Sequence, residues 1–300
     1  MKFPYFCNLI IFWMKSNNKS YSSIAMLNDS CIVDTEGLKR KYAPEGSALR
    51  KCQLIMLEEV LLLDKICKKN GLTYYLSSGT ALGAARHQGF IPWDDDLDIA
   101  LPEKDYRKLI AVLHELDSDH YVLHDRYSDF NYINGFPKFR EKEGTMLGSF
   151  PERGMLYKYK GVGVDIFCVA RNSFVRAFVC AKIRVALLHY LYKIKNEGLR
   201  KIVTKVQWFV YQCFVPLTYP LNVFRKKGEL HYGIGQGFSH HYLWEDEIFP
   251  VTLTQFESLM MPVPRDLDAY LTHIYGNWRQ PPSEEEIAKT VHNQEFVALK

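Results

Sequence analysis

The sequence YYLSSGTALGAARHQGFIPWDDDLDIAL, Tyr74 to Leu101, decides the fold of this chain. We expect it to form a strand, a turn of small residues, a short helix, a second turn and an acidic strand. Successive side chains of a strand point to opposite faces, so Asp94, Asp96 and Asp98 would share one face of the acidic strand. The side chain of Asp95 would point to the other face.

Three carboxylates on one face of a strand repel each other, and a hard cation relieves the repulsion. Magnesium takes oxygen ligands, usually one or two carboxylates together with water and substrate phosphates. We therefore expect Asp94, Asp96 and Asp98 to bind Mg²⁺, or Mn²⁺. A calcium loop that starts at Asp94 is excluded, because its sixth position is Ile99 rather than glycine.

The small residues before the short helix suggest a phosphate site. Ser78, Gly79 and Thr80 lie where the helix starts, and backbone N–H groups and the helix dipole favour an anion there. Arg86 follows on the same helix and is expected to neutralise phosphate charge, since its guanidinium stays charged and binds in a bidentate manner. A phosphate site beside metal-binding carboxylates is typical of phosphoryl transfer.

The stretch SSGTALGAARHQGFIPWDDDLDIALP resembles the signature of the LicD family. Its better-known members are choline-phosphate transferases of bacterial surface glycans and fukutin-type ribitol-phosphate transferases. The resemblance implies a nucleotidyltransferase fold, in which a strand carries two acids and a neighbouring strand carries a third. Here the pair is Asp96 and Asp98, and the best third acid is Asp165 in GVGVDIFCV.

The resemblance extends over roughly residues 50 to 295, apart from a variable helical segment. Family members carry a basic pair before a threonine, and Lys138 and Arg140 match it ahead of Thr145. This implies a role for the pair near the donor phosphates, although an ordinary surface strand explains the pattern equally well.

These patterns predict an α+β fold, with a nucleotidyltransferase-like mixed sheet flanked by helices. We expect residues 1–47 to be a partly ordered leader and linker, and residues 48–300 to form a LicD-like domain. Leucines at spacings of three and four predict a helix from about Ala48 to Asn70, and Gly71 is a fitting helix stop. A basic helical insertion would occupy residues 171–220.

The insertion is basic and aromatic, and its second helix is expected over 199–215. That helix has an apolar stripe of Val203, Val206, Phe209, Val210 and Cys213, which we expect to pack against the catalytic core. One alternative is that this basic helix lies on an anionic membrane surface. Another is that the insertion binds the acceptor. Charged residues exclude a membrane span.

The net charge and the cysteine pattern of the chain bear on its binding partners and its location. The formal net charge is only +4, so a nucleic-acid-binding surface is not indicated. The seven cysteines are scattered without a C-x-x-C pair, which is typical of reduced thiols in a cytoplasmic protein. We expect a cytoplasmic location, with a peripheral contact at the inner face of the membrane as a further expectation.

The expected function is metal-dependent transfer of a phosphoryl-alcohol unit, such as phosphocholine, from a CDP-linked donor to a sugar hydroxyl. The acceptor would be a surface glycan or a lipid-linked glycan, such as lipopolysaccharide, teichoic acid or capsule. Asp165 would either complete the metal site or accept the proton of the attacking hydroxyl. Two alternatives stay open: a nucleotidyltransferase that makes an activated donor, and a catalytically silent module that binds a glycan or lipid.

Overall fold

The computed structural model describes residues 33–132, 134–147, 156–188, 191–233, 242–290 and 296–298. The chain divides into two units after Ile32, and the expected leader lies in the first unit, outside the described residues. The second unit begins with helix α2 (Thr35–Tyr42), which falls in the stretch assigned above to the linker.

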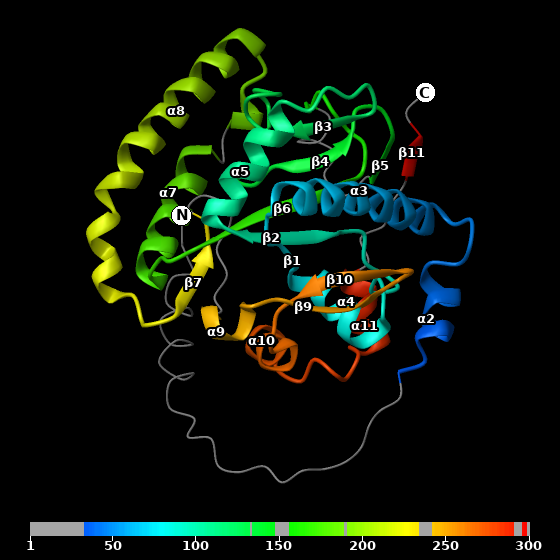
Figure 1. Cartoon of the computed structure of the whole chain (residues 1–300). Helices are drawn as coiled ribbons and strands as arrows, with labels where there is room; N and C mark the ends of the chain where they lie inside the picture. Colours follow the sequence, from blue (N-terminus) through cyan, green and yellow to red (C-terminus); the bar gives the residue numbers. More distant parts are fainter. Residues whose placement is uncertain are drawn as a thin grey trace. The chain divides into compact units, whose positions relative to one another are not determined.

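A mixed sheet organises the domain (Figure 1). Strands β2 and β6 are parallel, and the other pairs are antiparallel. The expected α+β class is confirmed, while the nucleotidyltransferase fold stays a prediction. The order across the sheet is β1 (Tyr75–Leu76), β2 (Asp98–Pro102), β6 (Gly163–Ala170), β4 (Lys138–Glu141) and β3 (Tyr121–His124). Two further strands extend the sheet from the end of β6, where β7 (Glu229–Tyr232) pairs with β6 and β8 (Leu243–Trp244) pairs with β7.

Helices and two small ribbons surround this sheet. The helices outside the insertion are α3 (Ala48–Asn70), α4 (Ser78–His87), α5 (Glu103–His114), α9 (Glu245–Ile248), α10 (Leu267–Tyr275) and α11 (Glu284–Thr290). The insertion contains α7 (Phe174–Leu188), α8 (Glu197–Leu217) and the 3₁₀ turns η1 (Leu191–Lys193) and η2 (Tyr219–Phe224). The ribbons pair β9 (Thr252–Phe256) with β10 (Leu259–Val263) and β5 (Thr145–Leu147) with β11 (Phe296–Ala298).

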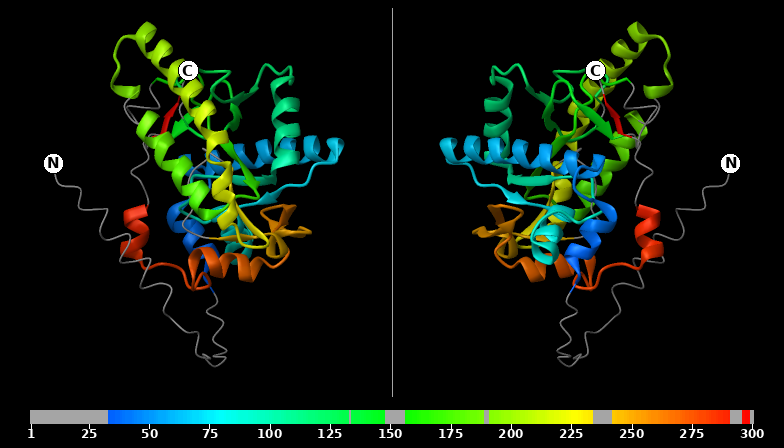
Figure 2. Two further views of the ribbon diagram at one scale, coloured as in Figure 1. Left: turned by 90° about the vertical axis from the view of Figure 1, so that its left-hand side faces the viewer. Right: turned by 90° about the vertical axis from the view of Figure 1, so that its right-hand side faces the viewer.

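The two faces of the sheet have separate cores. Helices α3 and α5 cover one face, where Ile99, Phe139 and Ile166 are fully buried. Helices α4 and α10 pack on the other face, against Tyr75 and Ala100. Figures 1 and 2 show α7 and α8 side by side beyond the end of β6, away from both cores.

Helix α3 forms where the sequence predicts it. The hydroxyl of Ser47 accepts a hydrogen bond from the backbone N–H of Arg50 at 3.2 Å and caps the first turn. Gly71 ends the helix in the left-handed region, with φ of 63°, a conformation that glycine adopts without a steric penalty. The predicted helix from Ala48 to Asn70 is confirmed at both ends.

The acidic stretch differs from its prediction. Strand β2 begins only at Asp98, so residues 94–97 precede the strand and strict alternation does not apply to them. The expectation that Asp95 points away from the other acids is therefore wrong, since its carboxylate lies beside those of Asp94 and Asp96.

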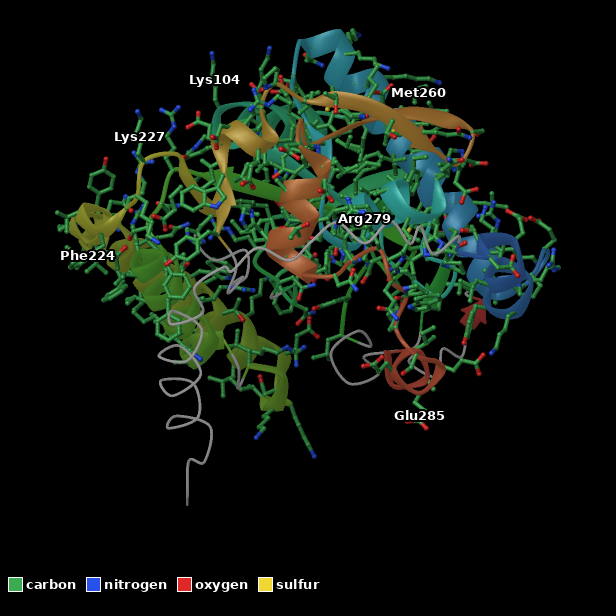
Figure 3. All side chains as sticks on the ribbon, turned by 90° about the horizontal axis from the view of Figure 1, so that it is seen from below. Lys104, Phe224, Lys227, Met260, Arg279 and Glu285 are labelled. Carbon is green, nitrogen blue, oxygen red and sulfur yellow. The ribbon has the colours of Figure 1, made fainter. Side chains whose placement is uncertain are left out.

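Helix α8 corrects a second expectation. Of the stripe predicted to pack inward, only Val203 reaches a small apolar cluster around Leu191. Val206, Phe209, Val210 and Cys213 are exposed. Figure 3 shows Phe224, in η2 just after this helix, at the edge of the domain. The packing prediction for the stripe is wrong, because α8 turns a different face inward.

The close approach of α4 to the turn that follows it generates a prediction. A Cβ atom on Gly83 would lie 2.4 Å from the carbonyl oxygen of Gly89 and 3.1 Å from the backbone nitrogen of Ile91. We expect Gly83→Ala to lower the free energy of unfolding by about 1–3 kcal/mol, because backbone atoms must move apart. Chemical denaturation measures this loss.

The matched control is Gly198→Ala, near the start of α8, where the nearest atom to an added Cβ is Asn196 Oδ1 at 3.5 Å. We expect this control to change stability by less than about 0.5 kcal/mol. Equal effects of the two substitutions would contradict the steric explanation.

Candidate functional site

Three ionisable side chains lie in direct register across three adjacent strands. Asp98 on β2 pairs with Asp165 on β6, and Asp165 pairs with Lys138 on β4. Directly paired residues project from the same face of a sheet, here the face covered by α4 and α10. Lys138 Nζ lies 2.5 Å from Asp165 Oδ1. The predicted third acid is therefore beside the acidic strand, and the structure brings Lys138 to it.

Burial and the charges of these side chains shift their pKa values. Burial, together with the carboxylate of Asp165, raises the pKa of Asp98 well above its usual range. Burial also raises the pKa of Asp165 to about 6, although Lys138 opposes this shift. Burial alone would lower the pKa of Lys138, but the neighbouring acids outweigh it and the pKa is raised. One lysine thus faces more negative charge than it can balance.

A cluster of carboxylates precedes the strand. One carboxylate oxygen from each of Asp94, Asp95 and Asp96 lies within 4.8 Å of the others, close enough to share a metal ion. Burial, followed by repulsion from Asp96, raises the pKa of Asp94 to about 8. Asp98 is not in this cluster, but its charge interacts with both Asp94 and Asp96. The cluster and the strand acids therefore form one continuous negative site.

Two side chains from neighbouring helices hold the acidic stretch in place. Gln53 on α3 donates from Nε2 to the carbonyl oxygen of Asp94 at 3.0 Å. The hydroxyl of Thr80 on α4 accepts from the backbone N–H of Asp98 at 2.8 Å. Thr80 is only 4% exposed, so its hydroxyl ties α4 to β2. Its predicted role in binding phosphate stays a prediction.

The start of α4 is a strained turn. Ser78 has a φ of 48°, in the left-handed region, which costs a non-glycine residue about 1–2 kcal/mol. Its backbone N–H donates to the hydroxyl of Tyr270 at 3.1 Å, and its own hydroxyl lies 2.8 Å from that of Tyr232. A Cβ on Gly79 would lie 3.0 Å from the carboxylate of Asp94. The helix therefore begins directly against the acidic cluster.

Arg86 and Arg140 each donate a hydrogen bond to a backbone carbonyl oxygen outside the acidic cluster. Arg86 is eight residues along α4 from Ser78, a rise of about 12 Å. It donates to the carbonyl oxygen of Trp278 and to His87 Nε2, each at 3.0 Å. Arg140 Nη1 donates to the carbonyl oxygen of Tyr159 at 3.1 Å. The phosphate-binding roles of both arginines stay predictions.

Sequence reasoning missed three tyrosines of the site. Tyr232 and Tyr270 support the turn at Ser78, and Tyr275 lies close to the acids. Burial raises the pKa of Tyr275, and the negative charges of Asp98 and Asp94 raise it further. Their distance in the chain hides them, since Tyr232 and Tyr270 bond to Ser78 across 154 and 192 residues.

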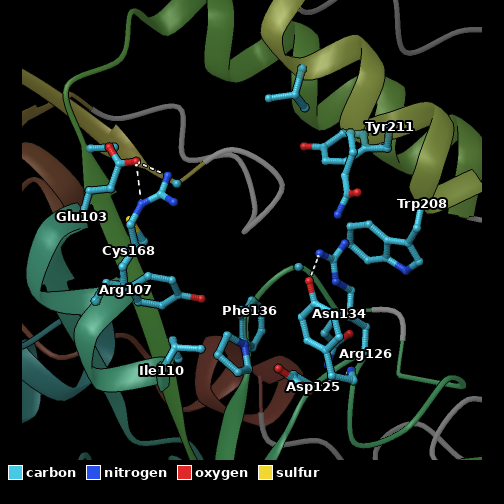
Figure 4. Close-up of a pocket in the computed structure, with 18 of the residues that line it drawn as sticks. Glu103, Arg107, Ile110, Asp125, Arg126, Asn134, Phe136, Cys168, Trp208 and Tyr211 are labelled. Atoms are coloured by element: carbon cyan, nitrogen blue, oxygen red, sulfur yellow. Dashed lines mark hydrogen bonds and ion pairs between the residues drawn. The ribbon is translucent and has the colours of Figure 1, made fainter. Parts of the chain in front are cut away.

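A pocket of about 560 Å³ lies between α5 and the helical insertion (Figure 4). Trp208 and Tyr211 line it from α8, and Arg107 lines it from α5. The Arg126 guanidinium is placed between two rings, 4.4 Å from the centroid of Trp208 and 4.6 Å from that of Tyr127. The lining is therefore aromatic, with arginines and the two acids Glu103 and Asp125, of which Glu103 pairs with Arg107.

The pocket adjoins the acidic site along the chain. Its lining residues Pro137 and Gly233 stand next to Lys138 and Tyr232 in the sequence. A row of rings also connects the two places. Tyr232 lies 5.2 Å from Phe167, and Phe167 lies 4.6 Å from Phe136 in the pocket wall, measured between ring centroids.

Comparison with known proteins identifies the region that carries these residues. Residues 71–176 match the LicD/FKTN/FKRP nucleotidyltransferase domain. The chain is 25% identical over 277 residues to lipopolysaccharide cholinephosphotransferase LicD of Haemophilus influenzae. The matched region covers 84% of this chain and 98% of that protein. The resemblance found in the sequence is confirmed, and α4, β2, β4 and β6 all fall inside the matched range.

Two other relatives match shorter parts. An uncharacterized protein of Rickettsia prowazekii, RP689, is 42% identical over 147 residues, 43% of this chain and 53% of that protein. Ribitol 5-phosphate transferase FKRP of Mus musculus is 35% identical over 72 residues, 24% of this chain and 15% of that protein.

The raised pKa of Asp94 predicts how stability depends on pH. The folded protein holds a proton on Asp94 up to about pH 8, whereas the unfolded chain releases it near pH 3.8. The folded state therefore binds more protons in this range, and the metal-free protein loses stability as the pH rises. We expect Asp94→Asn to raise the free energy of unfolding by about 1–2 kcal/mol at pH 8 and to change it little at pH 4.

Urea denaturation at the two pH values, with a chelator present, measures the difference. The control is Asp119→Asn, an exposed acid before β3, which should behave like the unmodified protein at both pH values. A gain of equal size at pH 4 and pH 8 would show that the effect does not come from the charge of Asp94.

Proposed function

We propose that the protein transfers a phosphoryl-alcohol unit to a glycan, on the basis of the match of residues 71–176 to the LicD/FKTN/FKRP nucleotidyltransferase domain. The donor would be a CDP-linked alcohol of the phosphocholine type, and the acceptor would be a sugar hydroxyl of a cell-surface glycan. The observation that carries the proposal is the direct register of Asp98, Asp165 and Lys138 beside the cluster at Asp94. The names of two relatives, a cholinephosphotransferase and a ribitol 5-phosphate transferase, support the reaction class.

The acidic site suits a divalent metal ion. Its oxygen ligands are grouped within 4.8 Å, and burial and repulsion between the carboxylates raise the pKa of Asp94, a cost that a bound cation would offset. Mg²⁺ or Mn²⁺ held by Asp94 and Asp96, with Asp98 beside them, would offset the negative charge of the donor pyrophosphate. Asp95 is an additional candidate ligand that the sequence pattern did not suggest.

The residues of the chain then have distinct tasks in the transfer. The sugar oxygen forms a bond to the phosphorus of the transferred unit, and the bond from that phosphorus to the CMP oxygen breaks. Asp165, with a pKa of about 6, would accept the proton of the attacking hydroxyl. Lys138 would stabilise the carboxylate before the proton arrives, and its charge would offset that of the departing CMP.

The start of α4 would hold the donor. The side chain of Ser77 does not cap this helix. The backbone N–H of Ser78 donates to Tyr270, and the N–H groups of Gly79 and Thr80 would bind a phosphate oxygen. The hydroxyl of Ser78 is fixed by Tyr232 at the same point. A phosphate bound here would lie beside Asp94, which approaches Gly79 closely.

We place the acceptor sugar in the pocket between α5 and α8. A volume of about 560 Å³ is in the range of small-molecule sites, and the rings of Trp208 and Phe136 offer apolar surfaces for a sugar ring. Arg176, which is 8% exposed, donates to Thr218 and Asn172, and no ion pair joins it to an acid among the described residues. An acceptor with a phosphate or carboxylate group would provide the opposite charge.

The reaction is tested by CMP release from CDP-choline and CDP-ribitol, with Mg²⁺ or Mn²⁺ and a glycan acceptor. We expect Asp98→Asn to reduce metal-dependent release at least about a hundredfold, because it removes charge from the centre of the site. The control Asp119→Asn should keep full activity. Release of pyrophosphate from CTP and phosphocholine, with no CMP released from the CDP-alcohols, would indicate a nucleotidyltransferase. No turnover with any donor would contradict the transferase proposal.

The acceptor site is tested with a soluble glycan fragment. We expect Trp208→Ala to raise the KM for the acceptor about tenfold, because the sugar loses a stacking surface, and to leave the KM for the donor unchanged. Leu253→Ala on β9 is the control, since it removes an apolar side chain that is 64% exposed. A rise in the KM for the donor, with an unchanged KM for the acceptor, would contradict the assignment of this pocket to the acceptor.

A further inference from the structure

The outer side of the insertion carries large apolar side chains that the described residues leave exposed. Between residues 199 and 224 nine of them have exposed fractions of 45% to 79%. They are Leu199, Ile202, Val206, Phe209, Val210, Leu217, Tyr219, Val223 and Phe224. We call this set the α8–η2 stripe. Exposed apolar patches of this extent on a soluble domain mark an interaction surface.

The spacing of these residues places them on one side of the helix. Steps of three and four residues follow the helical repeat from Leu199 through Ile202 and Val206 to Phe209. The opposite side of α8 is fixed to the domain by polar contacts. Arg200, 7% exposed, donates to Asn131 Oδ1 at 2.8 Å and to the carbonyl oxygen of Ile194 at 2.9 Å. The apolar side therefore faces outward because the polar side is held inside.

Positive charge accompanies the stripe. From residue 166 to residue 228 the sequence has twelve lysines and arginines and one acid, Glu197. Lys201 and Lys205 are exposed on α8, and Lys226 and Lys227 are exposed just after η2. A helix with an apolar side and flanking cations has the features of one that lies in the interface of a negatively charged bilayer.

We propose that the α8–η2 stripe docks the protein onto an anionic lipid surface, with α8 lying along the membrane plane. The stripe would enter the boundary between headgroups and acyl chains, while the flanking lysines contact acidic headgroups. Among the described residues, no helix has the length and apolar character of a membrane span. This inference rests on α8 and η2 alone and holds whichever group the enzyme transfers.

A second copy of the chain fits the α8–η2 stripe less well than an anionic lipid surface does. A symmetric dimer through α8 would bring two acid-poor, lysine-rich surfaces together, and like charges across an interface oppose association. An anionic bilayer offers the opposite charge to the same lysines. Charge complementarity therefore favours lipid.

The test is flotation of the full chain with vesicles of phosphatidylcholine alone or mixed with about 30% phosphatidylglycerol. We expect binding to the anionic vesicles and at least about tenfold weaker binding to the neutral ones, because each basic residue near the surface adds to the attraction. The double variant Val206→Glu, Phe209→Glu should lose at least about tenfold in partition coefficient, because two inserted apolar side chains become charged. It retains residues 1–32, so a loss cannot come from the apolar N-terminal sequence.

Met260→Glu is the matched control. Met260 is 58% exposed on β10, and Figure 3 shows it on the opposite side of the domain from Phe224 and Lys227. This control should bind vesicles like the unmodified protein. A second variant, Lys201→Glu with Lys205→Glu, should weaken binding to anionic vesicles while leaving binding to neutral ones unchanged.

Three outcomes would overturn the proposal. The first is no binding to anionic vesicles, and the second is binding that the stripe variants leave unchanged. The third is a lipid-free dimer in light scattering that the Val206→Glu, Phe209→Glu variant converts to a monomer, which would assign the stripe to self-association. Circular dichroism of each variant tests whether the helix content of the protein is retained. CMP release with a soluble acceptor should persist in the stripe variants, so a failure of docking is distinguishable from a failure of the proposed reaction.

Discussion

Repulsion among closely placed carboxylates is the constraint on which the rest of this structure depends. Asp98 and Asp165 face each other across adjacent parallel strands, and Lys138 neutralises only one of them. Burying such charges is costly unless each has a partner, so without a cation the site must hold protons. The raised pKa values of Asp94 and Asp165 express that cost. The surrounding contacts then serve to keep the acids where their repulsion would otherwise separate them.

Those contacts come from all around the acids. Gln53 holds the backbone of Asp94 from one side of the sheet, and Thr80 holds the backbone of Asp98 from the other. The strained turn at Ser78 needs the hydroxyls of Tyr232 and Tyr270. Strain and unfavourable charge in one place, supported by polar contacts from distant elements, are typical of functional sites rather than of packing alone.

Local signals in the sequence were sufficient where the determining contacts are local. The helix from about Ala48 to Asn70 was predicted because its leucine spacing and its terminal glycine lie within the helix or beside it. The partnership of Asp165 with the acidic strand also follows, since a lone acid in a buried strand needs a counterpart. The supporting roles of Tyr232 and Tyr270 could not be predicted, because no short-range pattern links residues more than 150 positions apart. The packing prediction for helix α8 was wrong for another reason. Amphipathic spacing shows that a helix has an apolar and a polar side, but it does not show which side packs against the domain. In α8 the buried hydrogen bonds of Arg200 hold the polar side against the domain.

The register across β2, β6 and β4 has a consequence for how the length of such a chain can vary. Adding or deleting one residue within any of these strands would turn its ionisable side chain to the opposite face, into the core beneath α3. The connections between the strands carry no such restriction, since a loop can lengthen at little cost in entropy. Insertions and deletions should therefore accumulate between β2 and β4, between β4 and β6, and between β6 and β7, where the helical insertion lies. The spacing of the site residues along the chain is free to change, whereas their positions within each strand are not.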